Sequence, residues 1–333
     1  MSTSVFITGG TGFLGSYIIK ELVQKNYVVR AIRRSGKRPF YIPASIFESV
    51  EWIDGDILDV MVLEDAMRGV DAVIHAAAKV SFANNDKNEL FKTNIEGTAN
   101  VVNAALANDV KKFIYVSSVA TLGNSVNGAP INESNPWKER LFSTSYAESK
   151  YHAEMEVWRA TGEGLPAAIV NPSTIIGYGD WDSSSCSIFK TVFKEFPWYT
   201  KGVNGFVDVE DVARAIVLLL QTDIQSERFI LNGDNTSFYE LFNLIADAFG
   251  KNRPRWEATP FLGEIAWRGE SIKSFFSGKP SILNKQTARI AQSKRYFENN
   301  KIRKYLPGFS FTSLSETINK ACKSYLDGMI DGQ

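Results

Sequence analysis

The chain has 333 residues, 44% of them hydrophobic and 22% charged, and its formal net charge at pH 7 is zero. This length suits one large domain or two closely packed ones, and the charge balance gives no general reason to bind nucleic acid or an anionic membrane. Cys186, Cys322, His75 and His152 form neither a disulfide framework nor a zinc-ligand pattern, so we expect no metal. The N-terminus does not resemble a signal peptide and the aliphatic runs are short, so we expect a cytoplasmic protein.

Residues 4–33 follow the order strand, turn, helix, strand. Apolar residues at 5–7 indicate a buried strand, and helical spacing follows at Ile18, Ile19, Leu22 and Val23. Between them, "TGGTGFLG" contains G-x-G-x-x-G, whose glycines allow a sharp turn, contact with a pyrophosphate and close packing of helix on strand. A helix N-terminus adds N–H groups that attract phosphate. We predict a dinucleotide site, rather than a glycine-rich turn without ligand, at Gly9, Gly12, Phe13, Leu14 and Gly15.

The residues after the second strand indicate which dinucleotide is bound. An acidic side chain about 20 residues beyond the glycines would bond the ribose hydroxyls of NAD. This chain instead has Arg33 and Arg34 in "RAIRRSGKR". Arginine matches the geometry of phosphate, so we predict contacts to a 2′-phosphate and a preference for NADP(H), with NAD(H) as the second possibility. The alternative is a solvated basic loop.

Strands and helices continue to alternate as far as "PAAIVNPSTIIG". This order predicts a Rossmann-type α/β fold with a doubly wound parallel sheet. Ligands of such sheets lie at the carboxyl ends of the strands, which we call the rim. We expect five segments to converge there: 9–15, Asp56, 76–78, 117–118 and 171–173.

The regular alternation ends near residue 172. We expect residues 1–172 to form the NADP-binding domain, with 206–222 returning to it. Residues 173–205 and 223–333 are expected to form a smaller mixed α/β cap that binds the substrate. Their helix-like and strand-like runs are shorter and less regular.

The stretch "TSYAESKYHAEMEVW" places Tyr146 four residues before Lys150, on one face of a helix. A capping box of Ser145 and Glu148 supports a helix start near Ser145. A tyrosine is a poor acid–base group at neutral pH unless a nearby cation lowers its pKa. Ser117 and Ser118, at the end of a predicted strand, could bond the substrate oxygen. A lone Y-x-x-x-K is usually a surface pair, but here it follows the glycine turn and the serines in the order that hydride transfer needs.

Together these motifs resemble the extended short-chain dehydrogenase/reductase family, also called the NAD-dependent epimerase/dehydratase family. The resemblance covers nearly the whole chain, in "TGGTGFLG", "GDILD", "HAAA", "TNIEGTANVV", "YVSSVATLG", "YAESK", "NPSTIIG" and "FVDVEDVARA". "VSSVATLG" and "VNPSTIIG" are most similar to the dihydroflavonol-reductase-like branch, which includes proteins labelled as sugar epimerases. Those epimerases usually have an acidic residue where this chain has Arg33.

The resemblance implies a role for each matching residue. Tyr146 would be the general acid–base, Lys150 would bond the nicotinamide ribose and lower the tyrosine pKa, and Ser118, or less favourably Ser117, would be the catalytic serine. Asn94 would organise the site from its helix. The remaining cofactor contacts implied are Asp56 and Ile57 at the adenine, Ala76, Ala77 and Lys79 along the ribose and phosphates, and Asn171, Pro172 and Ser173 at the nicotinamide. The family often forms homodimers through the helices that contain Asn94 and Tyr146.

Three functions follow from these residues. We favour an NADP(H)-dependent oxidoreductase that reduces a ketone or aldehyde on a bulky, partly apolar small molecule. The alternatives are a nucleotide-sugar epimerase or dehydratase using NAD(P), and a redox-inert NADP-sensing protein. The apolar substrate rests on aromatic residues expected in the cap, namely Phe193, Phe196, Trp198, Tyr199, Trp256, Phe261, Trp267 and Phe275. A sugar nucleotide would need cationic clamps, for which the candidates are Lys190, Lys194, Lys201 and Arg268.

Overall fold

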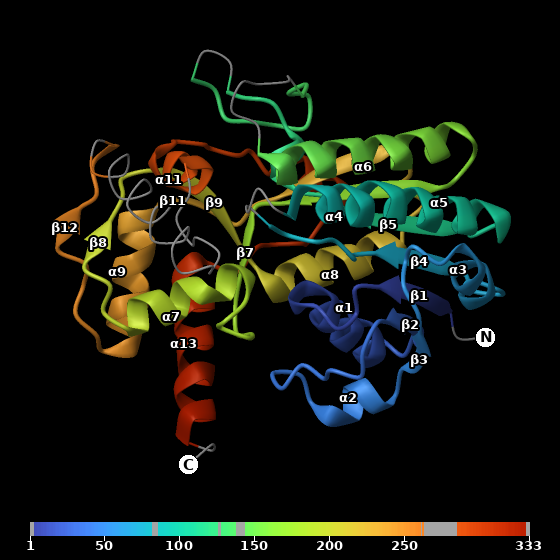
Figure 1. The fold of residues 1–333 in the computed structure, drawn as a ribbon, viewed down its shortest axis with the longest axis horizontal. Helices are drawn as coiled ribbons and strands as arrows, with labels where there is room; N and C mark the ends of the chain where they lie inside the picture. The colour runs from blue at the N-terminus through green and yellow to red at the C-terminus, as the bar shows by residue number, and fades with distance from the viewer. Residues whose placement is uncertain are drawn as a thin grey trace.

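The computed structural model describes residues 3–81, 86–125, 128–137, 144–260, 262 and 285–330. A seven-stranded, wholly parallel sheet in the order β10-β6-β5-β4-β1-β2-β3 dominates the fold, which confirms the predicted Rossmann-type class (Figure 1). Its strands are β1 (Ser4–Thr8), β2 (Val28–Arg33), β3 (Glu51–Asp54), β4 (Ala72–His75), β5 (Lys112–Val116), β6 (Ala167–Pro172) and β10 (Glu227–Leu231).

Helices cover both faces of this sheet. α1 (Phe13–Gln24) and α8 (Val209–Leu220) share one apolar cluster with the sheet, while α3 (Val60–Ala66), α5 (Gly97–Ala107) and α6 (Ser145–Gly162) share another on the opposite face. Every residue of β4 and β5 is buried, as expected of a parallel sheet covered on both sides. The strand order reverses between β1 and β4, which is the switch point where such sheets bind ligands.

The long helix expected after the fourth strand is interrupted. α4 (Lys87–Phe91) passes into a π-helical turn, Lys92–Glu96, before α5 begins. Asn94 lies in this turn and is only 1% exposed. Single π-helical turns occur often at functional sites, because the wider turn redirects a side chain.

The structure changes two details of the sequence prediction. β10, in a segment expected to belong to the cap, pairs with β6 along its full length and forms the edge of the large sheet, because its apolar residues fit beside that strand. The cap of α6 is Thr144, whose hydroxyl accepts the Ala147 N–H at 3.0 Å, so the expected capping box at Ser145 does not form. The predicted helix nevertheless begins at Ser145.

The smaller lobe contains a three-stranded sheet, a strand pair and several helices (Figure 1). The three-stranded sheet consists of β11 (Asp234–Ser237), β9 (Val203–Asp208) and β7 (Thr174–Ile176), and the pair consists of β8 (Trp198–Tyr199) and β12 (Trp256–Glu257). The helices of this part of the chain are α7 (Ser187–Phe193), α9 (Phe238–Phe249), α11 (Lys285–Gln292), α12 (Asn300–Tyr305) and α13 (Leu314–Ile330). The short helix α2 (Ala44–Glu48) lies outside this lobe, between β2 and β3. α7, α9 and α13 enclose an apolar cluster of their own.

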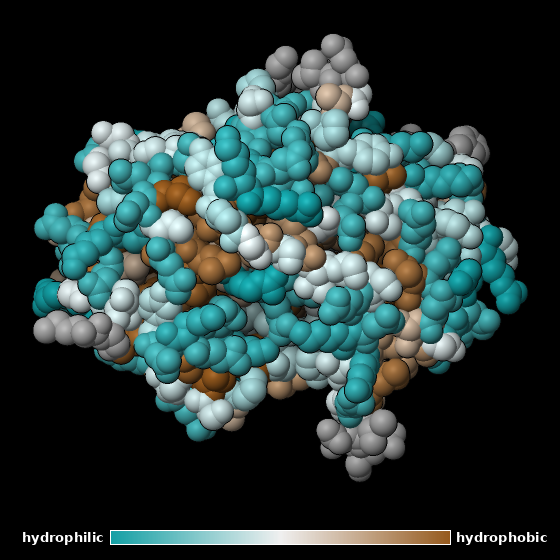
Figure 2. All heavy atoms as spheres, turned by 180° about the vertical axis from the view of Figure 1, so that it is seen from behind, coloured by the Kyte–Doolittle hydropathy of each residue, from teal (hydrophilic) through white to brown (hydrophobic). Residues whose placement is uncertain are grey.

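The surface seen from behind is mostly hydrophilic, and apolar side chains show in small separate patches (Figure 2). Among the described residues, no helix combines the length and the apolar character needed to cross a membrane.

Candidate active site

The glycine turn connects β1 to α1. Gly9 has a φ of +75°, and a Cβ there would lie 2.6 Å from the Ala77 nitrogen; at Gly15 it would lie 2.0 Å from the Gly9 oxygen. Side chains are therefore excluded at both positions. Gly12 caps α1 with no side-chain hydrogen bond, and the first helical turn, which includes Phe13 and Leu14, has no acidic residue. The N-terminus of α1 thus fits the pyrophosphate of a dinucleotide.

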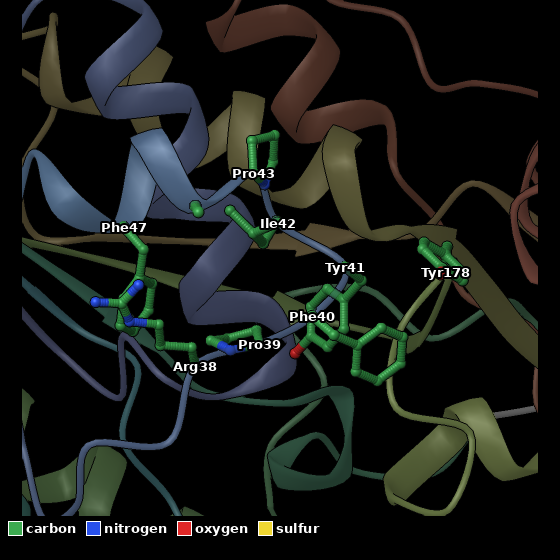
Figure 3. A pocket seen from close by; sticks show the side chains of 9 residues that line it. Arg38, Pro39, Phe40, Tyr41, Ile42, Pro43, Phe47 and Tyr178 are labelled. Atoms are coloured by element: carbon green, nitrogen blue, oxygen red, sulfur yellow. The ribbon is translucent and has the colours of Figure 1, made fainter. Parts of the chain in front are cut away.

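The arginines after β2 differ in their surroundings. The Arg33 Nε lies 2.8 Å from the Asp54 carboxylate, and its guanidinium lies over the Trp52 ring. Arg34 is exposed at the start of the following loop. This loop leads to a pocket of about 480 Å³ lined by residues 38–44, Phe47 and Tyr178, where Tyr178 lies across from Phe40 and Tyr41 (Figure 3). Arg33 is thus oriented by a neighbouring acid, whereas Arg34 is presented to solvent.

Two further segments reach the rim, one after β3 and one after β4. Asp56 accepts the Leu58 N–H at 3.0 Å, and Ile57 is buried against Gly97. Ala76 donates to the Thr8 carbonyl oxygen at 3.3 Å and Ala77 to the Thr8 hydroxyl at 3.2 Å, so β1 fixes their backbone.

Asn94 connects two parts of the rim. It accepts the Lys79 N–H at 2.7 Å, and its Nδ2 lies 3.0 Å from the Lys79 carbonyl oxygen and 2.9 Å from the Ser149 hydroxyl on α6. The Lys79 ammonium is held by Glu89 at 2.5 Å and Asp86 at 3.6 Å. Asn94 therefore fixes the backbone after β4 relative to α6, the organising position expected of it.

The two serines after β5 have different partners. Ser117 is buried and donates to the Glu154 carboxylate at 2.5 Å. Ser118 is half-buried and its hydroxyl is hydrogen-bonded to the Tyr146 side chain. The structure therefore brings Ser118, rather than Ser117, together with the tyrosine.

Burial raises the pKa of Tyr146 above its ordinary value, while its hydrogen bond with Ser118 acts in the opposite direction. A lowering by Lys150 had been expected, and the structure corrects this. The Lys150 ammonium instead donates to the Tyr115 hydroxyl and to the Val116 carbonyl oxygen, both at 2.8 Å. Lys150 is 2% exposed, and burial lowers its own pKa to about 7, opposed by the negative charge of Glu154.

A buried chain of hydroxyl and imidazole groups continues from Lys150. The Thr98 hydroxyl bonds Tyr115, donates to the Asn94 carbonyl oxygen at 2.6 Å and lies 2.9 Å from His75 Nε2. Because its single proton goes to Asn94, Nε2 of the imidazole must carry the hydrogen, and Nδ1 accepts from the Thr8 hydroxyl at 2.6 Å. Burial lowers the pKa of His75 to about 3, so the ring is neutral. The sequence analysis missed this chain, which links Lys150 to the Asn94 turn.

Asn171, Pro172 and Ser173 lie at the end of β6. Asn171 donates to the Ser118 carbonyl oxygen at 3.1 Å, and Pro172 is buried in the strand. The Ser173 hydroxyl is buried and has no hydrogen-bond partner within the described part of the chain. An amide-bearing ligand at the rim would satisfy it, so these residues fit the nicotinamide end of the cofactor.

The aromatic residues of the cap were expected to lie above the rim, and the structure places several of them elsewhere. Phe193 packs on Trp181 and Phe249 inside the cap, and β8 and β12, which contain Trp198, Tyr199 and Trp256, lie at the end of the cap farthest from the large sheet (Figure 1). The expectation of these rings above the rim is therefore wrong, because strand pairing carries them outward. Phe196 is exposed. Phe261, Trp267, Arg268 and Phe275 lie outside the described residues.

A different cap residue approaches the catalytic loop. The Arg295 Nη2 lies 3.5 Å from the Val119 carbonyl oxygen, and the guanidinium lies over the Phe297 ring. Residues 293–298 reach this position because their backbone pairs with Val203 and Ile131. Two of the cationic clamps considered for a sugar nucleotide are already paired, Lys190 with Asp182 and Lys201 with Glu257.

The switch-point sheet, the bare N-terminus of α1 and the Ser118, Tyr146 and Lys150 set define an NAD(P)-dependent enzyme of the extended short-chain dehydrogenase/reductase type. The chain belongs to the NAD dependent epimerase/dehydratase family, whose model matches residues 5–231.

Individual relatives agree with this family. The chain is 29% identical over 305 residues to a putative dihydroflavonol 4-reductase from Synechocystis sp., covering 89% of this chain and 87% of the relative. It is 29% identical over 331 residues to cinnamoyl-CoA reductase 1 from Oryza sativa subsp. japonica, covering 95% and 88%. The UDP-glucose 4-epimerase structure from Thermotoga maritima covers 98% of this chain and 100% of that one with a TM-score of 0.78, but at 20% identity it shows the fold alone.

Proposed function

We propose that the protein is an NADP(H)-dependent reductase of a ketone or aldehyde on a bulky, partly apolar small molecule. The observation that carries this proposal is the hydrogen bond between Ser118 and Tyr146 at the end of β5, one helical turn from Lys150. The names of the relatives, a dihydroflavonol reductase and a cinnamoyl-CoA reductase, support a carbonyl reduction and a substrate of that size.

The chain's own residues would handle the proton and the oxygen. The raised pKa keeps Tyr146 protonated near neutral pH, so its hydroxyl can donate to a carbonyl oxygen while Ser118 donates a hydrogen bond to the same oxygen. When bound, the reduced nicotinamide supplies the hydride that goes to the carbonyl carbon, and the product is an alcohol. Lys150, held by Tyr115 and Val116, would bond the nicotinamide ribose.

The remaining assignments belong to the same proposal. The glycine turn would hold the pyrophosphate, Asp56 and Ile57 the adenine, Ala76, Ala77 and Lys79 the ribose and phosphate path, and Asn171, Pro172 and Ser173 the nicotinamide. Arg34, with Arg33 beside it, would contact the 2′-phosphate that distinguishes NADP. The cap, without β10, would bind the substrate. A homodimer through α5 and α6 completes the proposal, and sedimentation velocity would test it.

The test is a steady-state assay of NADPH oxidation against hydrophobic ketones, aldehydes and flavanonols, run beside proton NMR of nucleotide sugars with the enzyme. We expect carbonyl-dependent oxidation that prefers NADPH to NADH. Inversion of a nucleotide sugar with no net cofactor consumption, and no activity on any carbonyl, would replace the reductase with an epimerase. Tight NADPH binding without either reaction would favour an NADP-sensing protein.

A further inference from the structure

We propose that Glu154 is a positioning residue of this active site, one that holds the Ser118 loop in place and keeps a negative charge behind Lys150. This inference rests on the proposed function. Glu154 lies on α6 one turn beyond Lys150 and is fully buried. A buried carboxylate is costly unless it is fully hydrogen-bonded and paired with a cation, so its environment indicates what it does.

The Oε2 atom of Glu154 binds three segments of the rim. It accepts from the Ser117 hydroxyl at 2.5 Å, from the Thr121 hydroxyl at 2.9 Å and from Asn171 Nδ2 at 3.0 Å. These donors come from the end of β5, from the 3₁₀ turn Val119–Thr121 and from the end of β6. One oxygen atom therefore connects the end of β5, the end of β6 and the turn Val119–Thr121. The loop that contains Ser118 lies between these three segments.

Ser118 is located between these anchors. Ser117 precedes it and Thr121 ends the turn after it, while Asn171 donates to the Ser118 carbonyl oxygen at 3.1 Å and the Thr121 hydroxyl oxygen lies 2.9 Å from that oxygen. The backbone of Ser118 is thus fixed on both sides by groups that Glu154 holds. Its own hydroxyl is left to accept the Ala120 N–H at 3.1 Å and to bond Tyr146. The geometry of the serine relative to the tyrosine follows from the carboxylate.

The Oε1 atom of Glu154 pairs with a cation. It accepts from Arg228 on β10 at 3.1 Å and from the Trp158 indole at 3.3 Å. Arg228 also donates to the Glu133 carbonyl oxygen at 2.9 Å, so the arginine is itself held in place. The groups that act on Lys150 are Tyr115 on β5, His75 on β4 and Glu154 on α6, and of these three only Glu154 has a carboxyl group.

The experiment compares Glu154→Gln with the wild type, with Glu154→Asp and with a matched control. Asp211→Asn also alters a fully buried carboxylate, which accepts the Thr312 hydroxyl at 3.0 Å and pairs with Arg214, but it lies on α8. We expect Glu154→Gln to lower kcat about 10- to 100-fold, because small displacements of catalytic groups cost that much, with KM for NADPH changed less than about 2-fold. The alkaline limb of the pH–rate profile should move to lower pH, and Glu154→Asp should restore its position.

A second readout needs no substrate. Lys150 is followed by NMR in protein labelled at the lysine Cε, with its signal assigned by its loss in Lys150→Met. We expect Lys150 to titrate at a lower pH in Glu154→Gln than in the wild type, and at the same pH in Asp211→Asn. The inference is overturned if Lys150 titrates at the same pH in Glu154→Gln as in the wild type. It is also overturned if Asp211→Asn is as destabilised as Glu154→Gln and loses as much kcat.

The two proposals fail in different ways. If Tyr146→Phe keeps its turnover, the reductase mechanism is wrong, and the lysine titration still decides the role of Glu154. If Tyr146→Phe is inactive while Glu154→Gln matches the wild type in kcat and pH profile, only the Glu154 inference is wrong.

Discussion

The rim of the large sheet contains buried polar residues, whereas the outer end of the cap contains partly exposed aromatic residues. At the rim, Asn94, Lys150 and Glu154 are each at most 2% exposed and hydrogen-bonded to groups from several elements. At the outer end of the cap, Trp198 and Trp256 contact one another, and Trp256 is 54% exposed. Buried polar networks fix a single geometry, whereas partly exposed rings tolerate rearrangement.

This difference assigns different tasks to the two regions. Changes at the rim should impair the reaction for every substrate, because they alter groups that act on the reacting atoms. Changes in the cap should alter the preference among substrates or leave the reaction unaffected, depending on their distance from the rim. Variants in the two regions test this division, and their expected effects decrease from the rim to the outer end of the cap.

The largest effect is expected for Tyr146→Phe. Removing the hydroxyl removes the proton donor and should lower kcat about 10³-fold for every carbonyl tested. NADPH binding, followed by fluorescence titration, should stay within about 2-fold, since the ring still packs. Retention of a tenth of the wild-type turnover would contradict the role given to the phenol.

Lys150→Met should impair both turnover and NADPH binding and should also change how stability depends on pH. The wild-type lysine has its pKa lowered from 10.5 to about 7, so between these values the unfolded chain binds more protons and stability rises with pH, by up to about 1.4 kcal/mol per pH unit. The methionine lacks this slope. Tm measured from pH 6 to pH 10 should therefore favour the variant most at low pH, and parallel curves would show that the lysine is not buried as described.

The serine pair gives an internal comparison. Ser118→Ala should lower kcat about 100-fold with little change in Tm, because it removes a donor to the substrate oxygen. Ser117→Ala should cost less activity but more stability, about 1–3 kcal/mol, because Glu154 loses one of its buried donors. Steady-state kinetics and thermal unfolding of both variants provide the check, and the reverse order would exchange the roles of the two serines.

Cofactor choice should respond to Arg33→Asp combined with Arg34→Ala. Loss of charge-assisted hydrogen bonds worth about 1.5–3 kcal/mol should reduce the preference for NADPH over NADH about 10- to 150-fold. Arg38→Ala is the matched control, since Arg38 lies in the same loop but pairs with Glu48. Equal Kd values for the two cofactors in the wild type would remove the NADP assignment.

The smallest effects are expected in the cap. Arg295→Leu should change the ratio of kcat/KM between two carbonyl substrates by about 10-fold, since its guanidinium lies beside the loop after Ser118. Trp256→Ala, at the far end, should change neither value by more than about 2-fold. A large effect of Trp256→Ala on substrate preference would break the division between the rim and the outer cap.

Local patterns predicted much of this architecture. The glycine turn, the alternation of strands and helices, and the four-residue spacing of Tyr146 and Lys150 are each written within a short stretch of sequence, and the parallel sheet then brings the strand ends together. The choice between Ser117 and Ser118 was less certain, because neighbouring residues at a strand end face different partners.

Contacts between distant segments could not be read in this way. Glu154 has a signal only in retrospect, as the residue one helical turn after Lys150, because its donors come from β5, β6 and β10. The pairing of β10 with β6 depends on a match between segments about 60 residues apart, which no local pattern contains. The aromatic residues of "FKEFPWYT" look the same in sequence whether they line a pocket or fill a lobe.

The position of β10 at the edge of the large sheet has a consequence for how the chain folds during synthesis. β6 ends at Pro172, but its outer neighbour begins only at Glu227, after β7, α7, β8, β9 and α8 have been made. Until β10 emerges from the ribosome, β6 pairs only with β5 and its other edge is open, and Glu154 lacks the Arg228 cation. We therefore expect the nascent cofactor-binding half to be more exposed to aggregation before β10 is made than after it.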